Sequence, residues 1–197
     1  NFKMELYGYQ LAFLEILSFY GIVRLLKTNR HLHSVSNLIY YWMTFTIMTG
    51  IWEFFFVLHY SEVNQQSQYL LTGKEHVWTN VYSASSLNPR NFSVLFYSEY
   101  GAYGDRMYMT SHDTWSRVIE SSHAMLCGIF CLLALCYRIA GNQTEYFITL
   151  SVGMGAQLMN SILYLFNYFH EVKDKDSVNY NSPSFPCGKL LQHRLFM

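Results

Sequence analysis

An ionisable pair inside a long apolar segment is the feature that most constrains this chain. Residues 115–138 read WSRVIESSHAMLCGIFCLLALCYR, and the segment is almost wholly apolar between His123 and Arg138. About 20 residues at a rise of 1.5 Å each cross the hydrocarbon core of a bilayer, so this segment is long enough to span it. Glu120 and His123 are three positions apart and share one face of a helix. Because an ionisable group inside a membrane helix is energetically costly, this pair predicts a functional site.

The composition also indicates a membrane protein. Of 197 residues, 51% are apolar and only 13% are charged, against about 25% charged residues in a typical soluble domain. Thirteen basic and thirteen acidic residues balance, so there is no basic field to attract nucleic acid, and we expect no nucleic-acid partner. The four cysteines are not spaced as a disulfide framework or a zinc site, and we expect neither a metal nor a cofactor.

Four apolar segments predict an all-α, polytopic membrane helix bundle that forms a single domain over residues 1–197. The predicted spans are residues 6–26, 36–60, 115–138 and 145–169. The polar connection 61–113 is too long to remain irregular in a small domain, so we expect it to fold over one membrane face as a lid. The polar region after the fourth span ends in an apolar stretch too short to cross, which has the appearance of a truncated fifth span.

The short connections predict the orientation in the membrane. Lys27 and Arg30 lie between the first two spans, and Arg138 lies at the end of the third. The positive-inside rule places these connections in the cytosol. The N-terminus and the lid are then expected on the lumenal side.

Three of the spans are expected to place polar side chains at one depth. At 1.5 Å per residue, Glu53 lies roughly 10 Å and Glu120 roughly 8 Å from the lumenal ends of their helices. The fourth span carries polar residues at helical spacing that reach about the same height, and the lid contributes an acid just above. Besides the two glutamates, the set comprises Gln157, Asn160, Ser161, Tyr164 and Asp105.

Two interpretations of this polar layer remain open. Polar residues in membrane bundles often satisfy one another and fix helix packing. Two carboxylates favour a ligand or catalytic pocket instead, because packing by hydrogen bonds does not require charge. Two neighbouring carboxyls in an apolar pocket tend to separate into a neutral acid and an ionised base, which suits proton addition and removal on a lipid.

The aromatic residues near this layer allow two interpretations as well. Trp52, Phe56, Trp115 and Tyr164 would stabilise a cation if their ring faces lined the pocket. The alternative is that they belong to the aromatic belt of a membrane interface.

Four motifs in order along the chain resemble the EXPERA superfamily, and most closely its branch of sterol Δ8–Δ7 isomerases, the emopamil-binding-protein type. The sigma-2 receptor shares that fold. The motifs are EFFFVLHYSE, SEYGAYGDRMYM, SRVIESSHAMLCG and AQLMNSILYLF, and the similarity covers about residues 37–169. The resemblance implies five membrane helices around a sterol-sized cavity in the endoplasmic reticulum. It also implies that Glu120 transfers the proton, with Glu53 assisting, and that Asp105 is the acidic residue of the lid.

The chain departs from the isomerase pattern at several positions. That pattern has a histidine where this chain has Thr49, a threonine at His123 and an acid at Ser161, and its fifth-span residues would follow Met197. The first hypothesis is therefore a sterol isomerase, with His123 as a further catalytic residue and Thr49 lining the site. The second is a non-catalytic protein that binds a sterol or another lipid, as a homodimer or as a subunit of a larger membrane complex. The mitochondrial inner membrane is the alternative location. A transporter is disfavoured because no half of the chain is repeated.

Overall fold

The computed structural model describes residues 5–105 and 114–171, except for the side chains of residues 114–117, 168 and 171. The predicted fifth span and the side chain of Trp115 lie outside this part of the chain.

Four long helices dominate the fold and confirm the four predicted apolar segments to within two residues at each end. They are α1 (Gly8–Leu26), α3 (Asn37–Leu58), α7 (Thr114–Ala140) and α8 (Gln143–Glu171). All four are long and apolar enough to cross a membrane. The hydroxyl of Ser36 caps α3 by accepting the N–H of Ile39 at 3.3 Å, and the turn between α7 and α8 is made by Gly141 at φ +82°.

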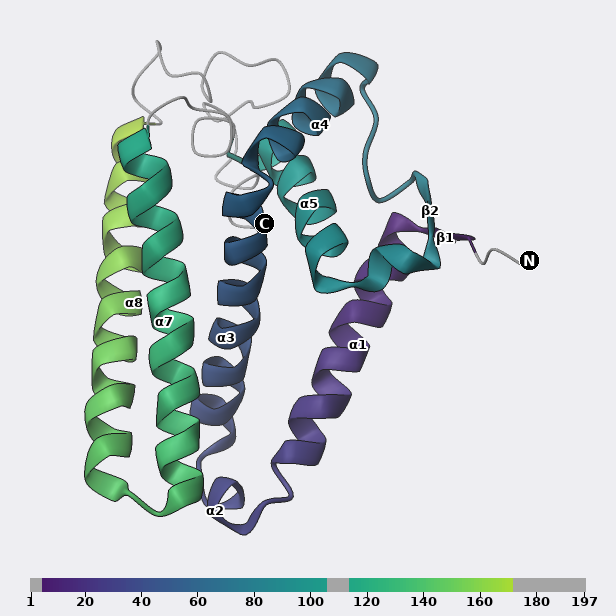
Figure 1. The fold of residues 1–197 in the computed structure, drawn as a ribbon. Coiled ribbons are helices and arrows are strands. Elements are labelled where there is room, and N and C mark those ends of the chain that lie inside the picture. The colour runs from purple at the N-terminus through teal and green to yellow at the C-terminus, as the bar shows by residue number, and fades with distance from the viewer. Residues whose placement is uncertain (1–4, 106–113, 172–197) are drawn as a thin grey trace.

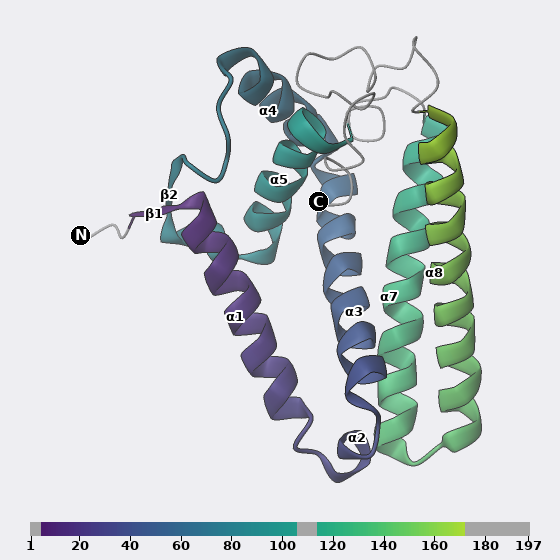
Figure 2. The same ribbon diagram turned by 180° about the vertical axis from the view of Figure 1, so that it is seen from behind.

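The helices follow one another in a row rather than in a closed ring. In Figures 1 and 2, α3 and α7 run side by side, and α8 packs on the other side of α7. Helix α1 is near α3 where the two are joined through residues 27–36 and diverges from it toward the other end of the bundle. The short helix α2 (Arg30–His33) and the α7–α8 turn lie at the same end of the bundle. Both α1 and α8 consequently leave most of their apolar surface uncovered.

The described part of the connection between α3 and α7, residues 60–105, is folded and lies toward the opposite end of the bundle (Figure 1), and its position over a membrane face stays a prediction. Its elements are α4 (Tyr60–Gly73), strand β2 (Val81–Ser83), the 3₁₀ turn η1 (Ala84–Leu87), α5 (Pro89–Glu99) and the π-helical turn η2 (Tyr100–Gly104). Asn88 caps α5 by accepting the N–H of Asn91 at 2.9 Å, and Pro89 occupies the first position of the helix, which tolerates proline. We refer to residues 60–105 as the lid.

A buried carboxylate holds the lid together. Glu99 lies 2.6 Å from Nδ1 of His76 through Oε1 and accepts the N–H of Val77 at 2.9 Å through Oε2. The ring of Tyr103 stacks on His76 with 4.2 Å between centroids. Burial, with the charges of Glu99 and Glu75 nearby, raises the pKa of the Tyr103 hydroxyl.

The all-α prediction missed a two-stranded ribbon. Strand β1 (Glu5–Tyr7) pairs antiparallel with β2, with Leu6 opposite Tyr82. Strands this short carry no alternating pattern that sequence analysis can detect. The ribbon ties the start of α1 to the lid, where a Cβ on Gly8 would come within 2.0 Å of the Val77 carbonyl oxygen.

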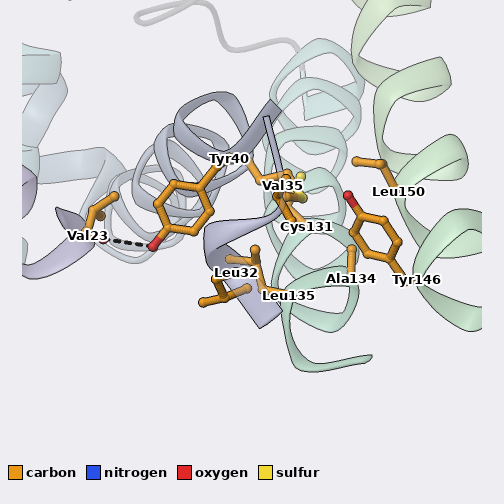
Figure 3. Packing of buried hydrophobic residues seen from close by; sticks show 10 residues of the cluster. Val23, Leu32, Val35, Tyr40, Cys131, Ala134, Leu135, Tyr146 and Leu150 are labelled. Atoms are coloured by element: carbon orange, nitrogen blue, oxygen red, sulfur yellow. Dashed lines mark hydrogen bonds between the residues drawn. The ribbon is translucent and has the colours of Figure 1, made fainter. Parts of the chain in front are cut away.

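The largest buried cluster lies at the α2 end and joins all four long helices. Figure 3 shows Tyr40 of α3 with its hydroxyl donating to the Val23 carbonyl of α1 at 2.8 Å. The same cluster includes Cys131 of α7 and Tyr146 of α8. This packing holds the C-terminal part of α1, at Val23, against the bundle.

Helices α3 and α7 approach each other most closely at two glycines. A Cβ on Gly50 would lie 3.1 Å from the Ala124 carbonyl oxygen, and one on Gly128 would lie 3.3 Å from that of Thr46. Small residues at such positions allow membrane helices to pack backbone to backbone. This contact sets the distance between the helices that carry Glu53 and Glu120.

Replacing Gly50 with leucine is therefore expected to destabilise the bundle. Overpacking of a close contact typically lowers the free energy of unfolding by about 1–3 kcal/mol, so the thermal midpoint in detergent should fall. Gly21→Leu is the matched control, since nothing lies within 4 Å of a Cβ at that position. Equal midpoints for the two variants would show that the α3–α7 contact does not require glycine.

Candidate functional site

Glu53 is a buried carboxylate at the point where three elements meet. It lies near the end of α3 with 5% of its surface exposed. The hydroxyl of Tyr97 on α5 donates to Oε2 in a short hydrogen bond, and the hydroxyl of Ser121 on α7 donates to Oε1 at 2.9 Å. Hydroxyl donors on both oxygens satisfy the hydrogen-bonding capacity of this buried carboxyl group.

The position of α5 follows from two further contacts with α3. The Ser93 hydroxyl donates to the Trp52 carbonyl at 2.6 Å, and the Tyr97 ring lies 4.8 Å from that of Phe56. Buried side chains thus place the Tyr97 hydroxyl over Glu53.

Glu120 lies on a different face of α7 from Ser121. It is half-buried, and Nδ2 of Asn160 on α8 donates to its Oε2 at 3.2 Å. Consecutive residues in an α-helix differ by about 100° in direction. Helix α7 therefore presents Ser121 to Glu53 and Glu120 to α8, at one level along the bundle.

Asp105 extends the polar layer toward the lid. It is buried, and its Oδ2 accepts the hydroxyl of Tyr164 on α8 at 3.1 Å. The Tyr164 oxygen also lies 3.1 Å from the hydroxyl of Tyr100. Because Tyr164 is one helical turn beyond Asn160, Asp105, the last residue of the lid, meets α8 about one turn, roughly 5 Å, farther along than Glu120 does.

The imidazole of His123 is directed at α8. Its Nε2 lies 3.0 Å from the Ala156 carbonyl oxygen and 3.4 Å from Sγ of Cys127. A carbonyl accepts only, so Nε2 carries a hydrogen and donates it. The hydroxyl of Thr49 donates to the Thr46 carbonyl of its own helix at 3.1 Å.

The predicted aromatic residues Trp52 and Phe56 are buried and pack on the lid. The Trp52 ring lies 5.2 Å from Phe92 and 5.5 Å from Phe96. Trp52 is also the hydrogen-bonding partner of the half-buried Glu15 on α1. These rings join α3 to the lid, and whether any of their faces meets a ligand stays a prediction.

Two predicted residues of α8 differ in their surroundings. Gln157 is half-buried, whereas Ser161 is exposed and its hydroxyl donates to the Gln157 carbonyl at 2.9 Å. Trp115 has no described side chain. Within the described residues, no group of three or more histidine, cysteine, aspartate or glutamate side chains has the arrangement of a metal site.

The structure thus brings two sets of predicted residues together, Glu120 with Asn160 and Asp105 with Tyr164. The partners of Glu53 were not predicted. Ser121 is next to Glu120 in the sequence, and this position gives no indication that the Ser121 hydroxyl contacts Glu53. Tyr97 is one of 17 tyrosines, and no motif distinguishes it.

Compared with protein-family models, curated protein sequences and solved structures, this chain matches none.

The hydroxyl donors predict how the protein responds to loss of the Glu53 carboxylate. Glu53→Ala leaves the Tyr97 and Ser121 hydroxyls without this acceptor, which should lower the free energy of unfolding by about 3 kcal/mol. Glu53→Gln should lower it less, because a hydroxyl can also accept a hydrogen bond from the amide.

Thermal unfolding in detergent measures both changes. Glu62→Ala is the control, since 57% of the Glu62 side chain is exposed, and it should unfold as the wild type does. A Glu53→Ala protein as stable as this control would contradict a structural role for the carboxylate.

Proposed function

We propose that this chain is a membrane protein that binds a sterol or another lipid beside the polar layer, and that it shifts a carbon–carbon double bond of the Δ8–Δ7 type. The observation that carries the proposal is the layer itself. Glu53, Glu120 and Asp105 lie near one end of four apolar helices. Glu53 accepts a hydrogen bond from α7, and Glu120 and Asp105 each accept one from α8. Placing three carboxyl groups at such a depth is costly for packing alone.

The surroundings of the two glutamates support different roles in such a reaction. Glu53 accepts two hydroxyl donors and is buried, so its carboxyl group is held in one position. Glu120 is more exposed and has an amide donor on one oxygen, which leaves it better able to exchange a proton. Separation of two carboxyls into a charged and a proton-carrying group is a recurrent arrangement in acid–base catalysis.

The proposed reaction needs no cofactor. Glu120 gives a proton to one carbon of the double bond, which leaves a carbocation at the other carbon. Removal of a proton from the neighbouring carbon restores a double bond one position away, and the proton returns to the enzyme. The negative charge of Glu53 stabilises the cation during these steps.

The second candidate is a lipid-binding protein without catalysis, acting as a homodimer or a subunit of a membrane complex. The direction of the His123 imidazole favours this second candidate. The ring contacts the backbone of α8, so it does not take the place of the histidine that the isomerase pattern has where this chain has Thr49. Residence in the endoplasmic reticulum follows from the resemblance alone, as does the fifth span, and the mitochondrial inner membrane is the alternative.

Glu120→Gln is expected to keep the fold and abolish isomerisation. The substitution preserves size and hydrogen bonding but removes the transferable proton, and loss of general acid–base catalysis lowers rates by about 10²–10⁴-fold. Conversion of a Δ8 sterol by the purified protein, followed by gas chromatography with mass spectrometry, measures the change. Glu62→Gln in the exposed part of the lid is the control, and unchanged turnover in Glu120→Gln would remove Glu120 from the chemistry.

Mass spectrometry of the lipids that copurify separates the two candidates. We expect a sterol or another single lipid class to be retained by the wild type and reduced by Glu120→Ala. Retained sterol without any turnover would favour the non-catalytic candidate. Absence of any enriched lipid would overturn both.

A further inference from the structure

The end of the bundle opposite the lid concentrates positive charge. Lys27 and Arg30 lie between α1 and α3, Arg138 lies in the last turn of α7, and Arg24 lies in the last turn of α1. The acidic residue nearest to Arg138 in the sequence is Glu145, which is exposed in the first turn of α8. The one nearest to the other three basic residues is Glu15 on α1. None of these groups takes part in the proposed function above.

The guanidinium of Arg138 is held rigidly across the α2 turn. Its Nε donates to the His31 carbonyl at 3.2 Å, its Nη2 donates to Ser34 Oγ at 2.6 Å, and its Nη1 donates to Gln143 in a short hydrogen bond. The guanidinium carbon also lies 5.4 Å from the centroid of the Tyr146 ring. These contacts fix the position of the charge before any ligand arrives.

A second guanidinium is anchored on the same residue. Nε of Arg30 donates to the His31 ring at 3.1 Å, so the ring of His31 holds Arg30 and its carbonyl holds Arg138. A guanidinium has five N–H donors. The described contacts use one donor of Arg30 and three of Arg138, which leaves both ends of the Arg30 fork and part of the Arg138 fork for an acceptor.

No carboxylate compensates these charges in the described part of the chain. Ion pairs form there only between His59 and Glu62 and between His76 and Glu99. Two like charges fixed near one residue repel each other, and an anion bound between them offsets this repulsion. Guanidinium groups match the geometry of a phosphate with paired N–H···O hydrogen bonds.

The height of the two arginines indicates where such a phosphate comes from. The apolar spans end at Leu26 and Ala140 and begin again at Asn37 and Gln143, and all four boundaries meet at this end (Figure 1). The arginines therefore lie at the edge of the hydrocarbon region, where lipid headgroups are found.

We propose that Arg30 and Arg138, anchored on His31, form a binding site for the phosphate of an anionic phospholipid in the adjoining leaflet. Lys27 adds positive charge nearby but is engaged separately, since its Nζ donates to the Val35 carbonyl at 3.2 Å and lies 4.9 Å from the centroid of the Tyr40 ring. The site is independent of the polar layer and of any chemistry there.

Native mass spectrometry of the purified protein in a neutral detergent tests the site. The protein is titrated with phosphatidylglycerol or with phosphatidylcholine, and retained lipid is counted. The wild type should retain phosphatidylglycerol in preference, and Arg30→Gln should weaken this retention about fivefold, the effect of one basic residue near a charged headgroup. Phosphatidylcholine binding should be equal in both proteins.

Arg90→Gln is the matched control, because Arg90 is an exposed arginine in the first turn of α5 in the lid and does not belong to the α2 turn. It should retain phosphatidylglycerol as the wild type does. An equal loss in Arg90→Gln and Arg30→Gln would show only general attraction between charges and would overturn the site, as would unchanged retention in Arg30→Gln.

Further measurements distinguish loss of the lipid site from loss of folding and from binding of a free anion. The thermal midpoint of Arg30→Gln should equal that of the wild type, because the described side-chain contact that it loses is the exposed one with the His31 ring. Arg30→Lys keeps the charge but loses the forked guanidinium, so it should retain lipid to an intermediate degree. Millimolar inorganic phosphate should not displace the lipid. Full displacement by phosphate would identify a site for a free anion and overturn the assignment to a lipid.

Discussion

The carboxylate of Glu53 is the constraint on which the rest of this bundle depends. A buried charge without hydrogen-bonding partners is strongly destabilising in an apolar environment, so the fold must bring donors to it. They come from α5 and α7, and the lid is consequently held against the ends of two long helices. The Ser93 hydroxyl on the Trp52 carbonyl strengthens the same junction. A single polar requirement thus accounts for why the lid packs on the α3–α7 pair instead of extending into solvent.

Helix α7 distributes the polar groups among its neighbours through the angular spacing of its residues. Ser121 is presented to α3 and α5, whereas Glu120 and His123 are presented to α8. Two turns further along, Gly128 allows α3 to approach closely. The two glutamates therefore lie at one level but in different surroundings, and that difference is the physical basis for assigning them different roles in the proposed proton transfer.

The two ends of the bundle have opposite chemistry, although the chain as a whole carries no net charge. The lid end gathers carboxyl groups that are satisfied by hydroxyl, amide and imidazole partners. The α2 end gathers guanidinium groups that are anchored by backbone carbonyls and neutral side chains. The first arrangement pairs each carboxyl group with a donor from the protein, whereas the second leaves N–H donors for an acceptor from outside. This contrast is why the proposed chemistry is assigned to one end and a phospholipid headgroup to the other.

The sequence by itself determined the four apolar helices, their ends, and the shared level of Glu53, Glu120 and Asn160, because helical periodicity and rise are local properties of the chain. It also predicted a folded connection after the second span, which holds for the described residues 60–105, although the β1–β2 ribbon escaped detection for lack of a pattern. Only the tertiary structure decided which donors serve each carboxylate. The partners of Glu53 lie 44 and 68 positions away in the sequence, and their selection depends on how each helix is rotated about its axis. The direction of the His123 ring toward α8 depends on the same rotation, which is set by packing between helices and which no local pattern encodes.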